Sequence, residues 1–491
     1  MGMKDGMSGA HLLRNLIVWF LSLTPLFIGF EAFALSNNLG MRVPAQNQVV
    51  AAPKAASAFF DGVDAASQPV MDAARKNIEA IRKGDLTITL TNEQGQPLTG
   101  VARARLVNHA FDFGAHLSGF IKGDQPTPLA RNVQEAADEL FNTVVVTGYW
   151  KMVEPKRGQL NWEATDALLR WAQEHHKNTR FHCIIYTFPK WVQLINTEQA
   201  WWDTFEARIK SVAERYGKTI KEFDVINEMV SEQVAWPDKK KVIDSYKNFP
   251  YLWEPKNGAR ILTIARKYLP NAKLVVLETG ISTPVNQHFL ATVEYDRALA
   301  ALGAPFDYCG HQAHFYINGA MPFREGHPEG GPGAFTMRPL SAGLDLLAAV
   351  GKPVVVTEFN PPSREGHSGK SLSKAGLTPE ELAAWTVNYT TLVFSKPYMR
   401  GLSRWFVVDE GRGADAGILT ANGEKKPVYF ALRKLLKETW NTDWTGPLKE
   451  GQAAFRGYYG TYEILVKGYA PAQVTCSTFD QRVAKIAMRR N

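Results

Sequence analysis

Short apolar stretches alternate with longer amphipathic ones from Phe111 to about residue 440. Eight stretches have the length and β-branched content of buried strands, and they begin at residues 111, 142, 180, 223, 273, 306, 353 and 401. The segments between them, such as residues 162–176, 200–217 and 379–395, have the apolar spacing of helices that cover a core. Eight strands separated by crossover helices predict the α/β class, as a (β/α)8 or TIM barrel over residues 111–440.

The segments that flank the barrel have a different pattern. Residues 71–110 contain a helical stretch and then two alternating segments around a polar turn, which predicts a helix followed by a β-hairpin. Alternation returns in the carboxyl-terminal β-segment, residues 445–491, and predicts a second hairpin over residues 453–471. We therefore expect the two flanks to pair into one small accessory β-domain. Three tyrosines are expected in its core, with stacking on sugar rings as the alternative: Tyr458, Tyr459 and Tyr462.

The amino-terminal segment has the layout of an export signal. A basic amino end precedes an apolar run over residues 16–30, and small residues follow at Ala32 and Ala34. This layout predicts a signal peptide over residues 1–34, a linker over residues 35–70, and a secreted or periplasmic protein without membrane contact after cleavage. The alternative is a retained membrane anchor, although the run is short for a span and is interrupted by polar and proline residues.

Composition and charge narrow the class of protein. Hydrophobic residues make up 45% of the chain and charged residues 21%, which is typical of a globular protein and excludes extensive disorder. The formal charge of +8 is scattered rather than gathered in a basic stripe, so we expect no nucleic-acid partner, while an acidic polysaccharide stays open. Cys183 and Cys309 lie in apolar runs and are expected to be buried, with no disulfide required. We expect a monomer.

The candidate chemistry lies where the predicted strands end. In a barrel of this kind the active site is at the carboxyl ends of the strands. Seven polar or aromatic residues fall there: His182, Asn227, Glu228, Gln312, His314, Glu358 and Trp405. Glu228 and Glu358 end the fourth and seventh strands and can face each other across the barrel mouth. Two carboxylates about 5 to 5.5 Å apart suit a retaining glycosidase, in which one protonates the leaving oxygen and the other attacks the anomeric carbon.

Each of these carboxylates has a blander interpretation when it is taken alone, since a glutamate at a strand end often caps a helix or pairs with arginine. As a pair, we expect repulsion and desolvation to raise the pKa of Glu228, and hydrogen bonds to keep Glu358 ionised. No H-E-x-x-H or comparable cluster accompanies the histidines, so the sequence predicts no cofactor, no metal and insensitivity to EDTA.

The motifs "DVINE", "CGHQAHF", "VVVTEF" and "WFVVDE" resemble the strand-end motifs of glycoside hydrolase family 10, the retaining endo-β-1,4-xylanases. The resemblance runs from about Phe111 to Lys437. It implies that Glu228 is the general acid/base and Glu358 the nucleophile. It also implies substrate-binding roles for a set of neighbours: Asn227 at the sugar 2-hydroxyl, His314 and Gln312 beside the two carboxylates, His182 at the cleavage subsite and Trp405 beneath the sugar.

The chain departs from the family pattern next to these residues. Val146 and Tyr149 stand where the family has Asn and Lys, although Trp150 is retained. Tyr186 and Thr187 replace a Trp-His pair. We keep Tyr149 and Trp150 as candidate substrate-binding residues. A Gly- and Pro-rich loop over residues 318–335 is longer than in the family, and is either a wall of the cleft or a surface insertion.

The interpretation is a secreted, metal-independent retaining glycoside hydrolase that cleaves β-1,4-xylan or a related decorated β-glycan through a covalent glycosyl-enzyme. Two alternatives stay open. One is a retaining glycosidase of different β-glycan specificity, and the other is a carbohydrate-binding barrel without turnover.

Overall fold

The computed structural model describes residues 59–121, 126–230, 252–280, 282–317, 335–364, 377–410 and 415–491. The predicted signal peptide, most of the predicted linker and all but the last residue of the long loop at 318–335 lie outside these ranges. Among the described residues, no helix combines the length and the apolar character needed to cross a bilayer.

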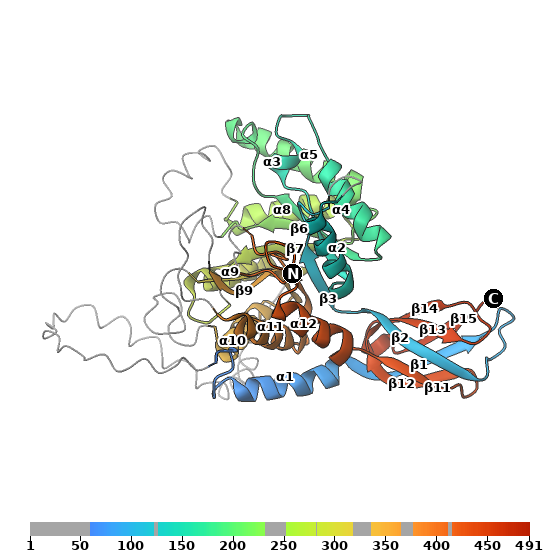
Figure 1. Ribbon diagram of the computed structural model, residues 1–491. Helices are drawn as coiled ribbons and strands as arrows, with labels where there is room; N and C mark the ends of the chain where they lie inside the picture. Colours follow the sequence, from blue (N-terminus) through green and yellow to red (C-terminus); the bar gives the residue numbers. More distant parts are fainter. Residues whose placement is uncertain are drawn as a thin grey trace, which may run out of the picture. The chain divides into compact units, whose positions relative to one another are not determined.

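The eight predicted strands form a closed parallel barrel with the order β10-β3-β4-β5-β6-β7-β8-β9 (Figure 1). They are β3 (Asp112–His116), β4 (Thr143–Thr147), β5 (Asn178–Ile185), β6 (Glu222–Asn227), β7 (Lys273–Thr279), β8 (Tyr308–Ile317), β9 (Val354–Arg364) and β10 (Met399–Arg404). The predicted (β/α)8 fold is therefore confirmed.

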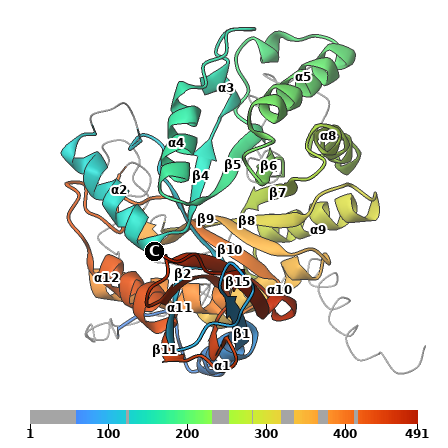
Figure 2. The same ribbon diagram turned by 90° about the vertical axis from the view of Figure 1, so that its right-hand side faces the viewer.

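Helices cover the outside of the barrel (Figure 2). They are α2 (Pro128–Leu140), α3 (Trp150–Val153), α4 (Glu163–Glu174), α5 (Glu198–Tyr216), α8 (Pro255–Tyr268), α9 (Gln287–Ala301), α10 (Met337–Ala348), α11 (Pro379–Phe394) and α12 (Pro427–Arg433), with the short η2 (Val192–Leu194) and the π-helical η3 (Lys434–Thr439). The helix α11 shows why such segments form. Its first turn has a capping box, in which Thr378 and Glu381 each accept the other's backbone N–H.

The packing of α11 against β9 shows which side chains of β9 point into the barrel. Tyr389 of α11 packs flat on Phe359 of β9, with ring centroids 5.1 Å apart and planes 19° apart. Successive residues of a strand point to opposite faces. Because Phe359 points outward to the helix, its neighbour Glu358 points into the barrel.

The flanking segments form two additional sheets, with orders β12-β1-β15 and β11-β2-β13-β14. Their strands are β1 (Lys83–Thr91), β2 (Val101–His109), β11 (Asp443–Pro447), β12 (Gln452–Tyr458), β13 (Gly460–Val466), β14 (Ala472–Cys476) and β15 (Val483–Ala487), with the short η4 (Phe479–Gln481) before β15. Each sheet combines strands from both ends of the chain, as expected for the accessory domain. Trp444 of β11 stacks on Phe455 of β12 at 5.2 Å, so aromatic side chains join the two sheets.

The hairpins predicted between residues 71 and 110 and over residues 453–471 are wrong, whereas β13 and β14 do pair as an antiparallel hairpin. β1 pairs with β12 and β15, whereas β2 pairs with β11 and β13, so neighbours in sequence lie in different sheets. β12 and β13 are divided in the same way. Alternation reports which face of a strand is buried, but it does not report which strand lies beside it. Tyr458 and Tyr462 are buried at 2% and 0% exposure, which confirms their expected place in the core.

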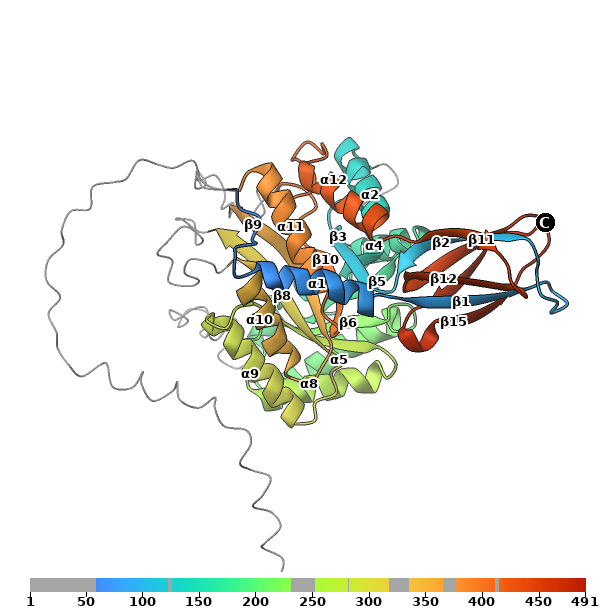
Figure 3. The same cartoon turned by 90° about the horizontal axis from the view of Figure 1, so that it is seen from below.

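The first helix, α1 (Gln68–Ile81), begins at Gln68 instead of residue 71 and lies against α10 and α11 (Figure 3). The residues before it are also held, since the backbone N–H of Phe60 donates to Glu381 at 3.0 Å. Cys183, Cys309 and Cys476 are all buried free thiols, as expected for the first two.

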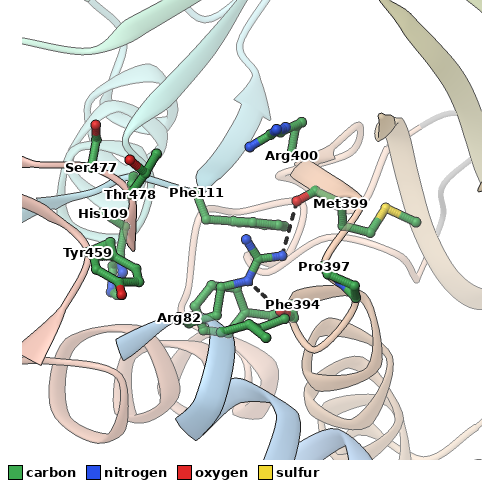
Figure 4. A pocket seen from close by; sticks show the side chains of 12 residues that line it. Arg82, His109, Phe111, Phe394, Pro397, Met399, Arg400, Tyr459, Ser477 and Thr478 are labelled. Carbon is green, nitrogen blue, oxygen red and sulfur yellow. Dashed lines mark hydrogen bonds between the residues drawn. The ribbon is translucent and has the colours of Figure 1, made fainter. Parts of the chain in front are cut away.

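Arg82, which links α1 to β1, attaches the accessory sheets to the barrel (Figure 4). Its guanidinium donates to the carbonyls of Phe394, Lys396 and Met399 at 2.7, 2.7 and 3.0 Å. Burial, together with the nearby charge of Arg400, lowers the pKa of Arg82 to about 10. Met399 begins β10, so this attachment is at the amino ends of the barrel strands.

Candidate active site

Glu228 follows the last residue of β6 and has a positive φ of 57°, a conformation that is uncommon for a side chain of its size. Both of its carboxylate oxygens accept hydrogen bonds. Tyr186 Oη donates to Oε2 at 2.7 Å, and Gln312 Nε2 donates to Oε1 at 3.1 Å. The same Gln312 nitrogen donates to Asn227 Oδ1 at 2.7 Å. One amide therefore holds the Asn227–Glu228 pair in place.

Gln312 also connects Glu228 to the second carboxylate. It lies on β8 directly opposite Glu358 of β9 in the strand register. The sequence places Glu228 and Glu358 far apart, but the closed barrel brings both to one end, with Gln312 beside each of them.

Glu358 is buried, with 3% of its surface exposed. His314 Nε2 lies 3.0 Å from Oε2, and His182 Nε2 lies 3.6 Å from Oε1. Burial raises the pKa of Glu358 to about 8; His182 opposes this rise and the charge of Glu228 adds to it. The expectation that hydrogen bonds keep Glu358 ionised is therefore wrong below a pH of about 8, because desolvation outweighs them.

The imidazole of His182 is oriented by a buried ion pair that the sequence interpretation missed. Its Nδ1 lies 2.8 Å from Oδ2 of Asp224, which is fully buried. Arg180 Nε is 3.3 Å from the same oxygen, and its Nη2 donates to the Thr357 carbonyl at 2.5 Å. The signal was present in the sequence, since Arg180 and Asp224 are charged residues inside apolar strands.

Trp405 follows β10 and lies beside the histidines of the site. Its ring stacks on His116 at 4.0 Å with an interplanar angle of 8°, and His182 meets it edge-on at 5.2 Å. Burial lowers the pKa of His116 to about 3, so this imidazole is neutral. His116 ends β3 and satisfies the criterion that found the other site residues, but the sequence interpretation overlooked it.

The side chains of Tyr149 and Trp150 lie in different surroundings, although the two residues are adjacent in the sequence. Tyr149 meets His182 edge-on at 5.3 Å, and burial with the charge of Glu358 raises the pKa of its phenol. Trp150 is fully buried away from this cluster, where its Nε1 donates to Glu154 at 3.0 Å and its ring packs against Trp191. The prediction that Trp150 contacts substrate is therefore corrected: Trp150 begins the short helix α3, and its ring is packed inside the protein.

Across the described part of the chain, no three His, Cys, Asp or Glu side chains gather in a way suited to a metal ion. The arrangement that is present consists of a pair of carboxylates, three imidazoles and an indole at the carboxyl ends of parallel strands. This fold and site define a parallel barrel protein with a pair of carboxylates at the carboxyl ends of its strands.

The model of Glycosyl hydrolase family 10 matches residues 106–434, and the chain belongs to this family. Its relatives include Anti-sigma-I factor RsgI6 of Acetivibrio thermocellus, 25% identical over 414 residues that cover 81% of this chain and 46% of that protein. Endo-1,4-beta-xylanase A of Halalkalibacterium halodurans is 24% identical over 42% of this chain and 53% of its own length. Endo-1,4-beta-xylanase 3 of Hypocrea jecorina is 34% identical over 34% of this chain and 46% of its own length. The chain thus spans about half the length of these curated relatives.

Solved structures agree with the barrel. Xylanase 10B of Thermotoga petrophila RKU-1, solved in complex with xylobiose, has a TM-score of 0.52 and 18% identity over 67% of this chain and 95% of that chain. Native xylanase 10B of Thermotoga maritima has the same TM-score and identity, and 96% of it is covered. At this identity the likeness supports the fold.

Proposed function

We propose that the chain is a retaining glycoside hydrolase that cleaves β-1,4-xylan or a related decorated β-glycan. The observation that carries this proposal is the placement of Glu228 and Glu358 on either side of Gln312 at the carboxyl ends of the barrel strands. Membership in glycosyl hydrolase family 10 supports the same assignment.

The proposed reaction has two displacements. In the first, Glu228 gives its proton to the glycosidic oxygen while the Glu358 carboxylate attacks the anomeric carbon, which releases the leaving sugar and forms a glycosyl ester on Glu358. In the second, Glu228 takes a proton from water as the water oxygen attacks the anomeric carbon and releases Glu358. The sugar leaves with its original anomeric configuration, and both carboxyl groups return to their initial states.

The neighbours of the pair have roles that follow from their contacts. Asn227 Oδ1 is occupied by Gln312, while its Nδ2 has no hydrogen-bond partner among the described residues. This amide therefore presents a donor next to Glu228, suited to the sugar 2-hydroxyl in the transition state. Trp405 is proposed as the floor of the cleavage subsite, and His182 and Tyr149 as its wall.

We also propose that the amino-terminal segment directs export to the periplasm or the medium and that the mature protein is a monomer. Sizing of the exported protein and sequencing of its amino end test both statements.

The alternative of a binding barrel without turnover is favoured by one observation, the relative that matches 81% of this chain and is named an anti-sigma factor. Release of reducing ends from xylans, glucans and mannans decides between the two functions. We expect the parent to release xylo-oligosaccharides, and Glu228→Ala and Glu358→Ala to abolish release. Binding of xylo-oligosaccharides by the parent without release from any polymer would overturn hydrolysis and favour the binding function.

A further inference from the structure

The imidazole that contacts Glu358 is itself held by an amide. Asn360 lies two residues after Glu358 on β9 and is fully buried. It pairs in register with His314 of β8, and its Nδ2 lies 2.7 Å from Nδ1 of that histidine. A chain of contacts thus runs from Asn360 through His314 to Glu358.

A backbone N–H group decides which atoms donate and which accept in the hydrogen bonds from Asn360 to Glu358. The backbone N–H of Phe406 points at Asn360 Oδ1, at 3.2 Å. A backbone N–H only donates, so the amide atom that faces it is the oxygen. The atom that faces His314 is therefore the NH2 group, which also only donates. Nδ1 of His314 must accept, and in a neutral imidazole with an accepting Nδ1 the proton is on Nε2.

We infer that Asn360 is a positioning residue, which holds His314 as the neutral tautomer protonated on Nε2, so that Glu358 receives a neutral hydrogen bond instead of an ion pair. A doubly protonated His314 would point an N–H at the NH2 group of Asn360, an arrangement of two donors that disfavours the charged ring. The tautomer assignment stands on these contacts alone. Only the description of Glu358 as the nucleophile rests on the proposed function.

The two histidines beside Glu358 are backed by different groups. His182 has the carboxylate of Asp224 on its Nδ1, which can balance a charged ring, whereas His314 has an amide. The other groups that act on Glu358 are Glu228, which follows β6, and Arg180 of β5, with Tyr149 close by. In this arrangement the positive charge near the nucleophile comes from the β5 side, and His314 supplies orientation without charge.

The direct test observes the ring nitrogens of His314 in the full chain. Long-range proton–nitrogen NMR spectra of protein labelled in histidine separate the two neutral tautomers and the imidazolium, and a His314→Gln variant assigns the signal. We expect the Nε2-protonated neutral pattern at pH 7. An imidazolium or an Nδ1-protonated pattern in the parent would overturn the inference. This measurement needs no turnover, so it is independent of the proposed function.

Asn360→Asp tests the consequence with a residue of the same shape. A carboxylate behind Nδ1 should convert His314 to the imidazolium at pH 7 and move the acidic limb of kcat/KM to lower pH by about one unit, since charged His314 then favours ionised Glu358. Asn360→Ala removes the donor, so we expect both tautomers and a drop in kcat of about tenfold at unchanged KM. An acidic limb unmoved by Asn360→Asp, in a variant that is folded and active, would contradict the assigned role. Loss of activity toward all glycans with the tautomer confirmed would instead refute only the proposed function.

Discussion

Tyr186 donates its phenolic hydrogen to Oε2 of Glu228 at 2.7 Å. Gln312 of β8 donates to the other oxygen of this carboxylate, Oε1, so each oxygen has its own donor. Tyr186 stands where the resemblance to the family implies a tryptophan, so this contact is the chain's own way of holding Glu228, the proposed acid/base.

Tyr186→Phe should lower kcat on xylan by about tenfold, because the Glu228 carboxylate loses one of the contacts that orient it for proton transfer. A matched comparison is Tyr216→Phe, which removes a phenol that binds Asp166 away from the site. Steady-state assays with xylan check both variants. Equal activities in Tyr186→Phe and Tyr216→Phe would contradict a role for the Tyr186 hydroxyl in the reaction.

Removal of each carboxylate should have a distinct chemical signature. Glu228→Ala should still form the glycosyl-enzyme from a xyloside with a nitrophenolate leaving group, which needs no proton, and added azide should then yield the β-glycosyl azide. Glu358→Ala should form no glycosyl-enzyme from this substrate. Mass spectrometry of the protein and NMR of the azide product separate the two outcomes. A covalent adduct in Glu358→Ala would reverse or refute the assignment.

The activity of the parent should rise with pH until Glu358 is ionised. Burial raises its pKa to about 8, and only the ionised form attacks, so kcat/KM is expected to rise about tenfold per pH unit on the acidic side. His182 lowers this pKa, so His182→Gln should move the acidic limb to higher pH. Initial rates from pH 4 to 9 measure the limb. A limb near the ordinary glutamate value in the parent would show that burial does not set it.

The same burial predicts how stability changes with pH. Glu358 is protonated in the folded chain up to a pKa of about 8, but ionises near 4.5 when unfolded, so it costs stability as pH rises between these values. Glu358→Gln should therefore become more stable than the parent across this window, by up to about 1.4 kcal/mol per pH unit. Urea unfolding at pH 5 and pH 8 measures the difference. The exposed Glu93→Gln serves as the control, and an equal pH response in both variants would contradict the prediction.

Replacement of two tryptophans should affect different properties: Trp150 the stability of the fold, and Trp405 the KM. Trp150 is fully buried, so Trp150→Ala should cost about 3–5 kcal/mol of the free energy of unfolding. Trp405→Ala removes the proposed sugar platform and should raise KM for xylo-oligosaccharides with a smaller loss of stability. Denaturant titrations and kinetics of both variants check this. A KM effect in Trp150→Ala at temperatures where it is fully folded would restore that residue to the substrate-binding set.

The barrel and the residues at its mouth were predictable because both depend on local patterns. Each strand is a short apolar run, and the closed parallel sheet brings all strand ends to one side, so Glu228 and Glu358 could be paired without knowledge of any distance. Pairing between distant strands has no such local signal. For this reason β1 and β2 were assigned to one hairpin although they lie in different sheets.

The directions of side chains next to a turn could not be predicted from the sequence either. Tyr149 and Trp150 are adjacent, yet the ring of Tyr149 meets His182 and the ring of Trp150 is fully buried, because the short helix α3 begins at Trp150. Asn360 was missed for a related reason. An amide inside a strand has no recognisable motif, and its importance depends on which ring nitrogen it faces.

Arg82 donates a hydrogen bond to the carbonyl of Met399, the first residue of β10, while Trp405 follows the last residue of the same strand. The accessory sheets are thus attached at the amino ends of the barrel strands, and the two carboxylates lie at the opposite, carboxyl ends. A molecule bound to the accessory sheets would therefore leave the end of the barrel that holds Glu228 and Glu358 uncovered.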